Sequence, residues 1–102
     1  MMQVTVEHNG STARLSLNGR FDFSSHREFR NACDEALNMS DANEIEADFS
    51  RVDYLDSSAL GMLLLLREKA QTANMKVSLL NCTGLVQQVL DVANFQRLFT
   101  IR

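Results

Sequence analysis

Asp56, Ser57 and Ser58 are the strongest candidates for chemistry in this chain, because two hydroxyls directly follow a carboxylate. They lie where an alternating, strand-like segment gives way to a strongly apolar helical one, so the pattern places a serine at a helix start. The first backbone N–H groups of a helix have no internal partners and carry the positive end of the helix dipole. An anion is stabilised there, and a phosphate on Ser57 would be well placed.

The same three residues have two other interpretations. Asp56 or Ser57 could simply be the N-cap of a structural helix. A serine hydrolase would need a Gly-x-Ser-x-Gly elbow and a histidine base. The chain lacks that elbow at Ser57, and its histidines, His8 and His26, fall in a hairpin and at a helix start. We therefore expect no catalytic residue and no enzyme activity.

The hydrophobic pattern predicts an α/β fold. Apolar residues alternate at 4–6 and 13–17 around Asn9-Gly10, which is typical of an antiparallel hairpin. Ser25 and Glu28 have the spacing of a capping box and precede a helical apolar pattern, which predicts the first helix. Cys33 falls on its apolar face and should be buried. Renewed alternation predicts further strands at 45–49 and 76–80.

A second helix is predicted from Asp56 to about Thr72. Its first half is apolar nearly all round, so we expect it to be covered on more than one side, by the sheet and by a neighbouring helix. At least one of Leu63 and Leu64 should be fully buried. Beyond it, Thr83 is placed to cap a third helix.

The end of the third helix and the tail are also predicted. Asn94 is a plausible left-handed stop for the third helix. Leu98, Phe99 and Ile101 should form a short helix or an edge strand.

Polar residues follow each parallel strand of this arrangement. Right-handed crossovers gather the loops after parallel strands at one end of the sheet, where partners of open α/β sheets usually dock. Asp22 also has a second interpretation, as a turn residue that contacts no partner. The residues gathered there are Asp22 after the second strand, Asp56, Ser57 and Ser58 after the third, and Asn81, Thr83 and Gly84 after the fourth.

Composition limits the classes of function. A chain of 102 residues with 45% hydrophobic residues fits one domain with one core. Its longest apolar run, Met62 to Leu66, falls far short of the roughly 20 residues of a membrane span, and the start has no signal-peptide pattern, so we expect a cytoplasmic protein without membrane insertion. A net charge of −3 with scattered basic residues argues against nucleic-acid binding. Cys33 and Cys82 stand alone, so we expect no metal and no cofactor.

The residues from Ala47 to Leu66 resemble the signature of STAS domains, the fold of anti-sigma factor antagonists. Two weaker matches extend the resemblance over nearly the whole chain: the element from Gly19 to Asp22, and the closing helix and tail from Thr83 to Ile101. The resemblance implies a single STAS domain over residues 1–102, with a mixed four- to five-stranded sheet and helices packed mainly on one face. Ala59 and Arg20 depart from the commoner Gly and Glu of the family.

The resemblance also implies a function, which is partner switching. In such antagonists the serine after the motif aspartate is phosphorylated by a partner kinase, which corresponds here to Ser57, with Ser58 as the second choice. The unmodified protein would bind an anti-sigma factor or a serine kinase of that type, phosphorylation would end the interaction, and a phosphatase would restore it. The alternative is a constitutive STAS subunit of a transporter ATPase or signalling assembly. The implied partner surface comprises Asp22, Asp56, Ser57, Ser58, Ala59, Leu60, Asn81 and Thr83.

Overall fold

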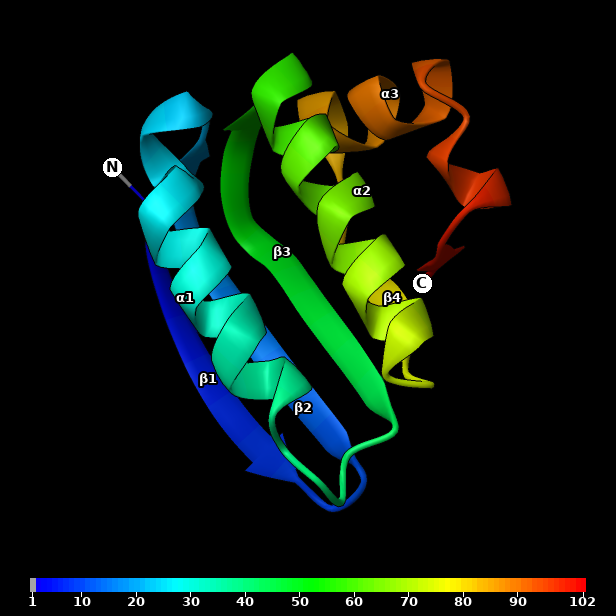
Figure 1. Ribbon diagram of the computed structural model, residues 1–102. Helices are drawn as coiled ribbons and strands as arrows, with labels where there is room; N and C mark the ends of the chain where they lie inside the picture. The colour runs from blue at the N-terminus through cyan, green and yellow to red at the C-terminus, as the bar shows by residue number, and fades with distance from the viewer. Residues whose placement is uncertain (1) are drawn as a thin grey trace.

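One mixed β-sheet forms the centre of the computed structural model, which describes residues 2–102 (Figure 1). Its strand order is β1-β2-β3-β4-β5; β1 and β2 are antiparallel, and all later neighbours are parallel. The expected sheet is confirmed, with an edge strand at the C-terminal end. The strands are β1 (Gln3–Asn9), β2 (Thr12–Phe21), β3 (Glu44–Leu55), β4 (Lys76–Leu80) and β5 (Thr100–Ile101).

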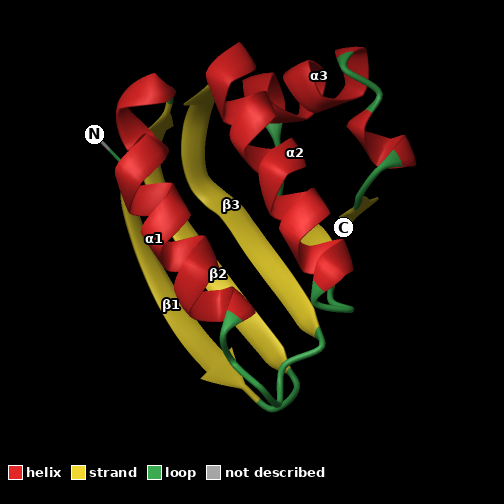
Figure 2. Cartoon of the chain, in the orientation of Figure 1, coloured by secondary structure: helices red, strands yellow, loops and turns green. Residues whose placement is uncertain are grey.

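Three α-helices and two short 3-10 turns connect the strands after the hairpin. Figure 2 shows α1 and α2 side by side on one face of the sheet, and both contact its strands. α3 contacts β3. Because α1 and α2 each follow the carboxyl end of a strand, both begin at the same end of the sheet. The helical segments are η1 (Phe23–Ser25), α1 (His26–Leu37), α2 (Ser57–Thr72), α3 (Gly84–Val92) and η2 (Phe95–Arg97).

Two turn signals are confirmed. Asn9 pairs with Thr12, and Gly10 between them has a φ of 63°, which glycine adopts without a steric penalty. Asn94 has a φ of 59° directly after the α3 cap, as expected for a left-handed stop.

The core lies between the sheet and the helix layer. Alternate residues of β2 and β3 point towards α1 and α2, and the aromatic rings of Phe21 and Phe29 join β2 to α1 with centroids 4.8 Å apart. From α2, Leu63 is 0% exposed, which confirms that one of the two leucines is fully buried. The strand residues of this layer are Ala13, Leu15, Leu17, Ile45, Ala47 and Phe49.

The opposite face of the sheet is polar. Arg14 from β2 and Arg102 after β5 both pair with Glu46 of β3, at 3.1 and 2.8 Å between nitrogen and oxygen. Both arginine side chains are partly exposed, so these pairs contribute little to stability individually. The alternation along β3 therefore explains both faces: apolar residues under the helices and charged residues on the uncovered side.

Two helix starts differ from the prediction. The capping box at Ser25 is wrong, because its hydroxyl donates to the Arg20 carbonyl at 2.9 Å and makes no cap. The η1 turn precedes α1, and it moves the capping role to Asp22. Thr83 stands at the N-cap position of α3, but its side chain makes no cap hydrogen bond either.

The cover over α2 agrees with the prediction in part. The all-apolar half was expected to be enclosed on more than one side, but Leu64 is 38% exposed and Leu65 44% exposed. The sheet and α1 do pack against two sides of α2, as predicted, but these two leucines keep exposed surface. Because this half of the helix is hydrophobic on all sides, it was expected to be buried. In the structure, part of its apolar surface is exposed.

The buried thiol of Cys33 should be chemically inert. Burial raises its pKa to about 12, and burial raises the pKa of the half-buried Cys82 thiol to about 11. At pH 8 both should react with iodoacetamide about a hundredfold or more slowly than they do in the guanidinium-unfolded chain, since only the thiolate reacts. Mass measurement of alkylation against time tests this; rapid labelling of Cys33 in the folded protein would contradict its burial.

Candidate functional site

The start of α2 is capped by Asp56 rather than by a serine. The Asp56 backbone is extended (φ −117°, ψ −175°), and its Oδ1 accepts from the Ala59 N–H at 3.1 Å and from the Ser58 hydroxyl at 3.0 Å. The open choice of cap is therefore settled in favour of Asp56. Ser57 becomes the first residue of α2, where its side chain is exposed and lies outside these hydrogen bonds. It is the accessible hydroxyl of the pair.

A second carboxylate is held in the same way on the neighbouring loop. β2 bends at Gly19, whose φ of 121° favours glycine, and then runs to Asp22. The Asp22 side chain accepts from the Ser24 hydroxyl and from the Ser24 N–H at 3.0 Å. The Ser24 hydroxyl lowers the pKa of the Asp22 carboxyl, so Asp22 is an anion at neutral pH.

The two acidic loops are joined through the backbone. The N–H of Asp56 donates to the carbonyl of Phe21 at 3.3 Å, which places the residue after Phe21, Asp22, beside the start of α2. The prediction that the loops after β2 and β3 meet at one end of the sheet is therefore confirmed. A further negative charge on Ser57 would join two carboxylates already present there.

Arg20 is the cation next to this acidic pair. Its guanidinium carbon lies 4.0 Å from the centre of the Tyr54 ring, and its Nε lies 3.8 Å from Asp22 Oδ2. Tyr54 thus orients the arginine by a cation–π contact from the neighbouring strand. Arg20, one of the two residues that depart from the pattern of the resembled family, therefore has a defined position beside Asp22.

The loop after β4 contributes less directly. Asn81 has a φ of 59°, and its side-chain amide donates to Asp48 Oδ1 at 3.0 Å, on the polar face of the sheet. That hydrogen bond holds its amide on the uncovered sheet face, and not against the Ser57 loop. Thr83 is exposed at the start of α3. Asn81 and Thr83 both follow β4, at the end of the sheet where they were expected.

One residue of the expected surface cannot contact a partner. Ala59 is 0% exposed, so the prediction that it binds a partner is wrong; it packs in the core as the third residue of α2. An alanine there is explained by lack of space. Leu60 is half-buried and keeps some surface.

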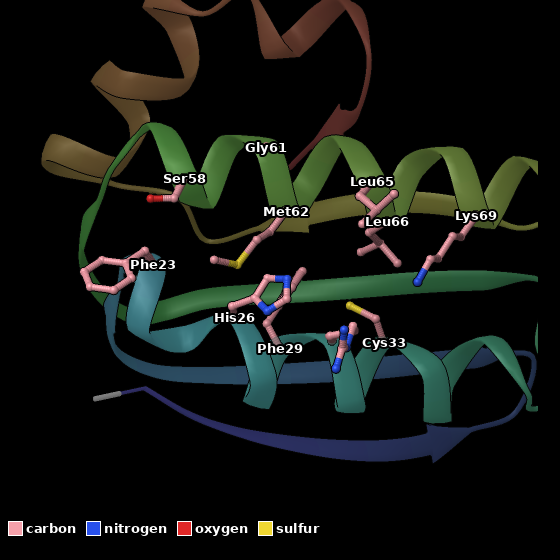
Figure 3. Close-up of a pocket in the computed structure, with 11 residues that line it drawn as sticks. Phe23, His26, Phe29, Cys33, Ser58, Gly61, Met62, Leu65, Leu66 and Lys69 are labelled. Atoms are coloured by element: carbon pink, nitrogen blue, oxygen red, sulfur yellow. The ribbon is translucent and has the colours of Figure 1, made fainter.

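Phe23, which directly follows Asp22 and is 75% exposed, was not predicted from the sequence as part of the site. An aromatic residue directly after Asp22, in a short loop without apolar periodicity, was the available signal. Figure 3 shows Phe23 and Ser58 at the same end of a groove between α1 and α2. Exposed aromatic side chains are frequent anchors of protein interfaces.

Within residues 2–102, no three side chains of the metal-binding types come together. His8 pairs with Asp41 at 3.1 Å beyond the far end of the first helix. Across the same residues, no helix is both long and apolar enough to cross a membrane.

Comparison with known sequences gives a family match over most of the chain. A family model described as "Mlab, STAS domain" matches residues 4–100. A STAS-domain containing protein from Pseudomonas aeruginosa (strain UCBPP-PA14) is 42% identical over 93 residues, which cover 91% of this chain and 90% of the relative.

Comparison with solved structures supports the fold. An anti-sigma factor antagonist from Mycobacterium paratuberculosis superposes with a TM-score of 0.87 at 17% identity, covering 99% of this chain and 85% of that one. The anti-sigma factor antagonist SpoIIAA in its unphosphorylated form superposes with a TM-score of 0.74 at 21% identity, covering 97% and 86%. At these identities the likeness concerns the fold alone.

Proposed function

The chain belongs to the STAS domain family, and from this premise we propose that it is an anti-sigma factor antagonist that works by partner switching. Its unmodified form binds a regulator, which is an anti-sigma factor or a serine kinase. This binding releases the protein that the regulator otherwise holds. A kinase ends the interaction by phosphorylating Ser57, and a phosphatase restores it. The protein acts in the cytoplasm as a binding module without catalysis of its own.

The observation that carries this proposal is the exposed hydroxyl of Ser57 beside two ordered carboxylates. Asp56 is fixed by its cap hydrogen bonds and Asp22 by Ser24, so neither can turn away easily from an added charge. A phosphate brings about −1.5 to −2 charges at neutral pH. Inside an interface it would repel these carboxylates and lose solvation, which opposes binding without any refolding.

The proposed partner surface is narrower than the sequence alone suggested. It consists of Asp22, Asp56, Ser57, Ser58 and Leu60, with Phe23 added and Ala59 removed. Asn81 and Thr83 remain proposed at its margin. SpoIIAA has been solved both unphosphorylated and phosphorylated, so a fold of this kind accommodates a phosphorylated state.

Phosphate should be found on Ser57 and not on Ser58. The Ser58 hydroxyl is half-buried and donates to Asp56 at 3.0 Å, whereas Ser57 is exposed at the first position of α2. A kinase must therefore break an existing hydrogen bond to reach Ser58 but not to reach Ser57. Phosphopeptide mapping of the protein from its native cell tests this; phosphate on Ser58 alone would overturn the assignment.

A second role remains, because α2 exposes two large apolar side chains, Leu64 and Leu65. Exposed apolar surface can mark a site of protein–protein interaction. The protein would then be a constitutive subunit of a transporter ATPase or signalling assembly, with the Ser57 region as an interface without phosphate turnover.

One experiment separates the two roles. The protein is recovered from its native cell, the proteins that co-purify are identified, and the phosphate on Ser57 is measured in the same sample. We expect an anti-sigma factor or serine kinase in the bound fraction and phosphate in a fraction of the free protein. Stoichiometric binding to an ATPase with no modification of Ser57 would favour the constitutive role.

A further inference from the structure

An apolar groove of about 540 Å³ runs between α1 and α2, on the face of the molecule that Figure 3 shows. Its two walls are regular helix faces. One wall follows every third or fourth residue of α1, and the other does the same along α2 from Ser58 to Lys69. At ~1.5 Å per helical residue, the α2 wall is about 16 Å long. The volume lies within the ordinary range of small-molecule sites.

The groove is mostly apolar, and its charged residues are cationic. Phe29 and Leu66 form buried parts of its lining, while Met62 and Leu65 are partly exposed along it. None of the lining residues is acidic. The Asp34 carboxylate pairs with Lys69 from just outside the lining, so Arg30, Lys69 and Asp34 together leave one positive charge, whereas the chain as a whole has a net charge of −3.

The cations are gathered towards one end. Lys69 of α2 reaches across to Asp34 of α1, with 3.5 Å between Nζ and Oδ1. Arg30 also lines the groove and lies one helical turn before Asp34, so the two residues are on the same side of α1. Phe23 and Ser58 stand at the opposite end (Figure 3).

Gly61 keeps the α2 wall open. It lies inside the helix, where glycine is less favourable than alanine, and its backbone does not require glycine. A Cβ built at this position would meet nothing within 4 Å. No packing constraint therefore explains this residue, and its effect is to leave free volume in the groove.

We propose that this groove binds a free fatty acid, a ligand beyond the proposed partner-switching role. The hydrocarbon chain lies along the apolar walls past Gly61, towards Phe23. The carboxylate lies at the other end, where Arg30 and Lys69 supply the positive charge that it requires. Charge complementarity selects an anionic amphiphile over a neutral or cationic one.

The probe is sodium dodecanoate below its micellar concentration, added to the ¹⁵N-labelled full chain and followed by NMR. Dodecyltrimethylammonium, with the same chain length and the opposite charge, is the matched control. We expect saturable shifts at Met62, Leu65 and Cys33, and an affinity at least tenfold higher for dodecanoate. Shifts centred elsewhere, such as at Val92, or equal affinity for both head groups would overturn the proposal.

Three variants locate the site. Gly61→Leu should fill the groove and weaken dodecanoate binding at least tenfold. A melting temperature of this variant equal to or above that of the wild type excludes misfolding as the cause. Arg30→Gln should weaken binding severalfold, whereas Arg27→Gln, on the same helix but outside the groove, should not. Unchanged binding in Gly61→Leu, or equal losses in Arg30→Gln and Arg27→Gln, would refute the assignment.

A third arm distinguishes a free fatty acid from a lipid surface. Phosphatidylglycerol vesicles should not co-sediment with the protein, because the groove accepts one chain and not a bilayer. Co-sedimentation without dodecanoate binding would overturn the proposal in favour of a membrane contact. None of these measurements uses the Ser57 partner, so their failure would leave the proposed switch untouched.

Discussion

Leu63→Ala should lower the free energy of unfolding by about 2–5 kcal/mol, the usual range for a leucine that leaves a cavity in a core. Leu63 is 0% exposed and lies between α2 and the sheet, so neighbouring side chains cannot easily collapse into the space. A small domain typically has a total stability of about 5–15 kcal/mol, so the loss is a large share of it. Because α2 begins with Ser57, the damage should also weaken partner binding.

Leu64 provides the matched control one position along the same helix. It is 38% exposed, so Leu64→Ala removes the same atoms from a partly solvated position and should cost well under half as much. Urea unfolding followed by circular dichroism measures both variants. If Leu63→Ala unfolded at the same urea concentration as the wild type, the placement of α2 against the sheet would be wrong.

Ser57→Asp should weaken partner binding at least tenfold, a change of about 1.4 kcal/mol, whereas Ser57→Ala should preserve it. The aspartate adds a charge beside Asp56 and Asp22, and like charges brought together in an interface are repulsive. Because a carboxylate carries less charge than a phosphate, the loss should be smaller than the loss on phosphorylation.

The loss of binding in Ser57→Asp should not be accompanied by a loss of stability. Asp56 caps α2, so Ser57→Ala removes no cap and should be close to neutral. Ser57→Asp places an anion at the first position of α2, which typically stabilises a helix by about 0.3–1 kcal/mol. A loss of binding together with equal or higher thermal stability would exclude unfolding as its cause.

The control for charge is Ser40→Asp, in the exposed segment between α1 and β3, at the other end of the sheet. It adds the same net charge away from Ser57 and should leave partner binding unchanged. Isothermal titration with the co-purified partner measures all three variants. Binding of Ser57→Asp as tightly as the wild type would show that repulsion at this position is not the switch.

The strand directions and the meeting of the loops after β2 and β3 could be predicted from the sequence because they depend on periodicity and chain direction. Ala13, Leu15 and Leu17 alternate as a half-buried strand must, and parallel crossovers bring Asp22 and Asp56 to one end of the sheet. These features rely on patterns that many residues share, so no single contact decides them.

Local capping could not be predicted as well, because several nearby side chains compete for the same few N–H groups. Ser25 had the right spacing to cap α1, yet a 3-10 turn capped by Asp22 comes first and the Ser25 hydroxyl bonds to Arg20. At α2 the choice between Asp56 and Ser57 depended on backbone angles that the sequence does not contain.

The exposed apolar residues were also beyond sequence reasoning. Hydropathy does not distinguish Leu63, which is buried at the sheet, from Leu64 and Leu65, which are exposed on the same helix. The groove depends on how far α1 lies from α2, and Gly61 becomes informative only when the space beside it is known. These are properties of the packed layers and not of any one segment.

The most direct test of the switch compares the protein with its own phosphorylated form. Phosphoserine is placed at position 57 by genetic code expansion, and the affinity for the co-purified anti-sigma factor or kinase is measured by titration at fixed salt. We expect phosphoserine at position 57 to weaken binding by more than the Ser57→Asp change does, and phosphatase treatment to restore the wild-type affinity. Equal affinity of the two forms would contradict partner switching at Ser57.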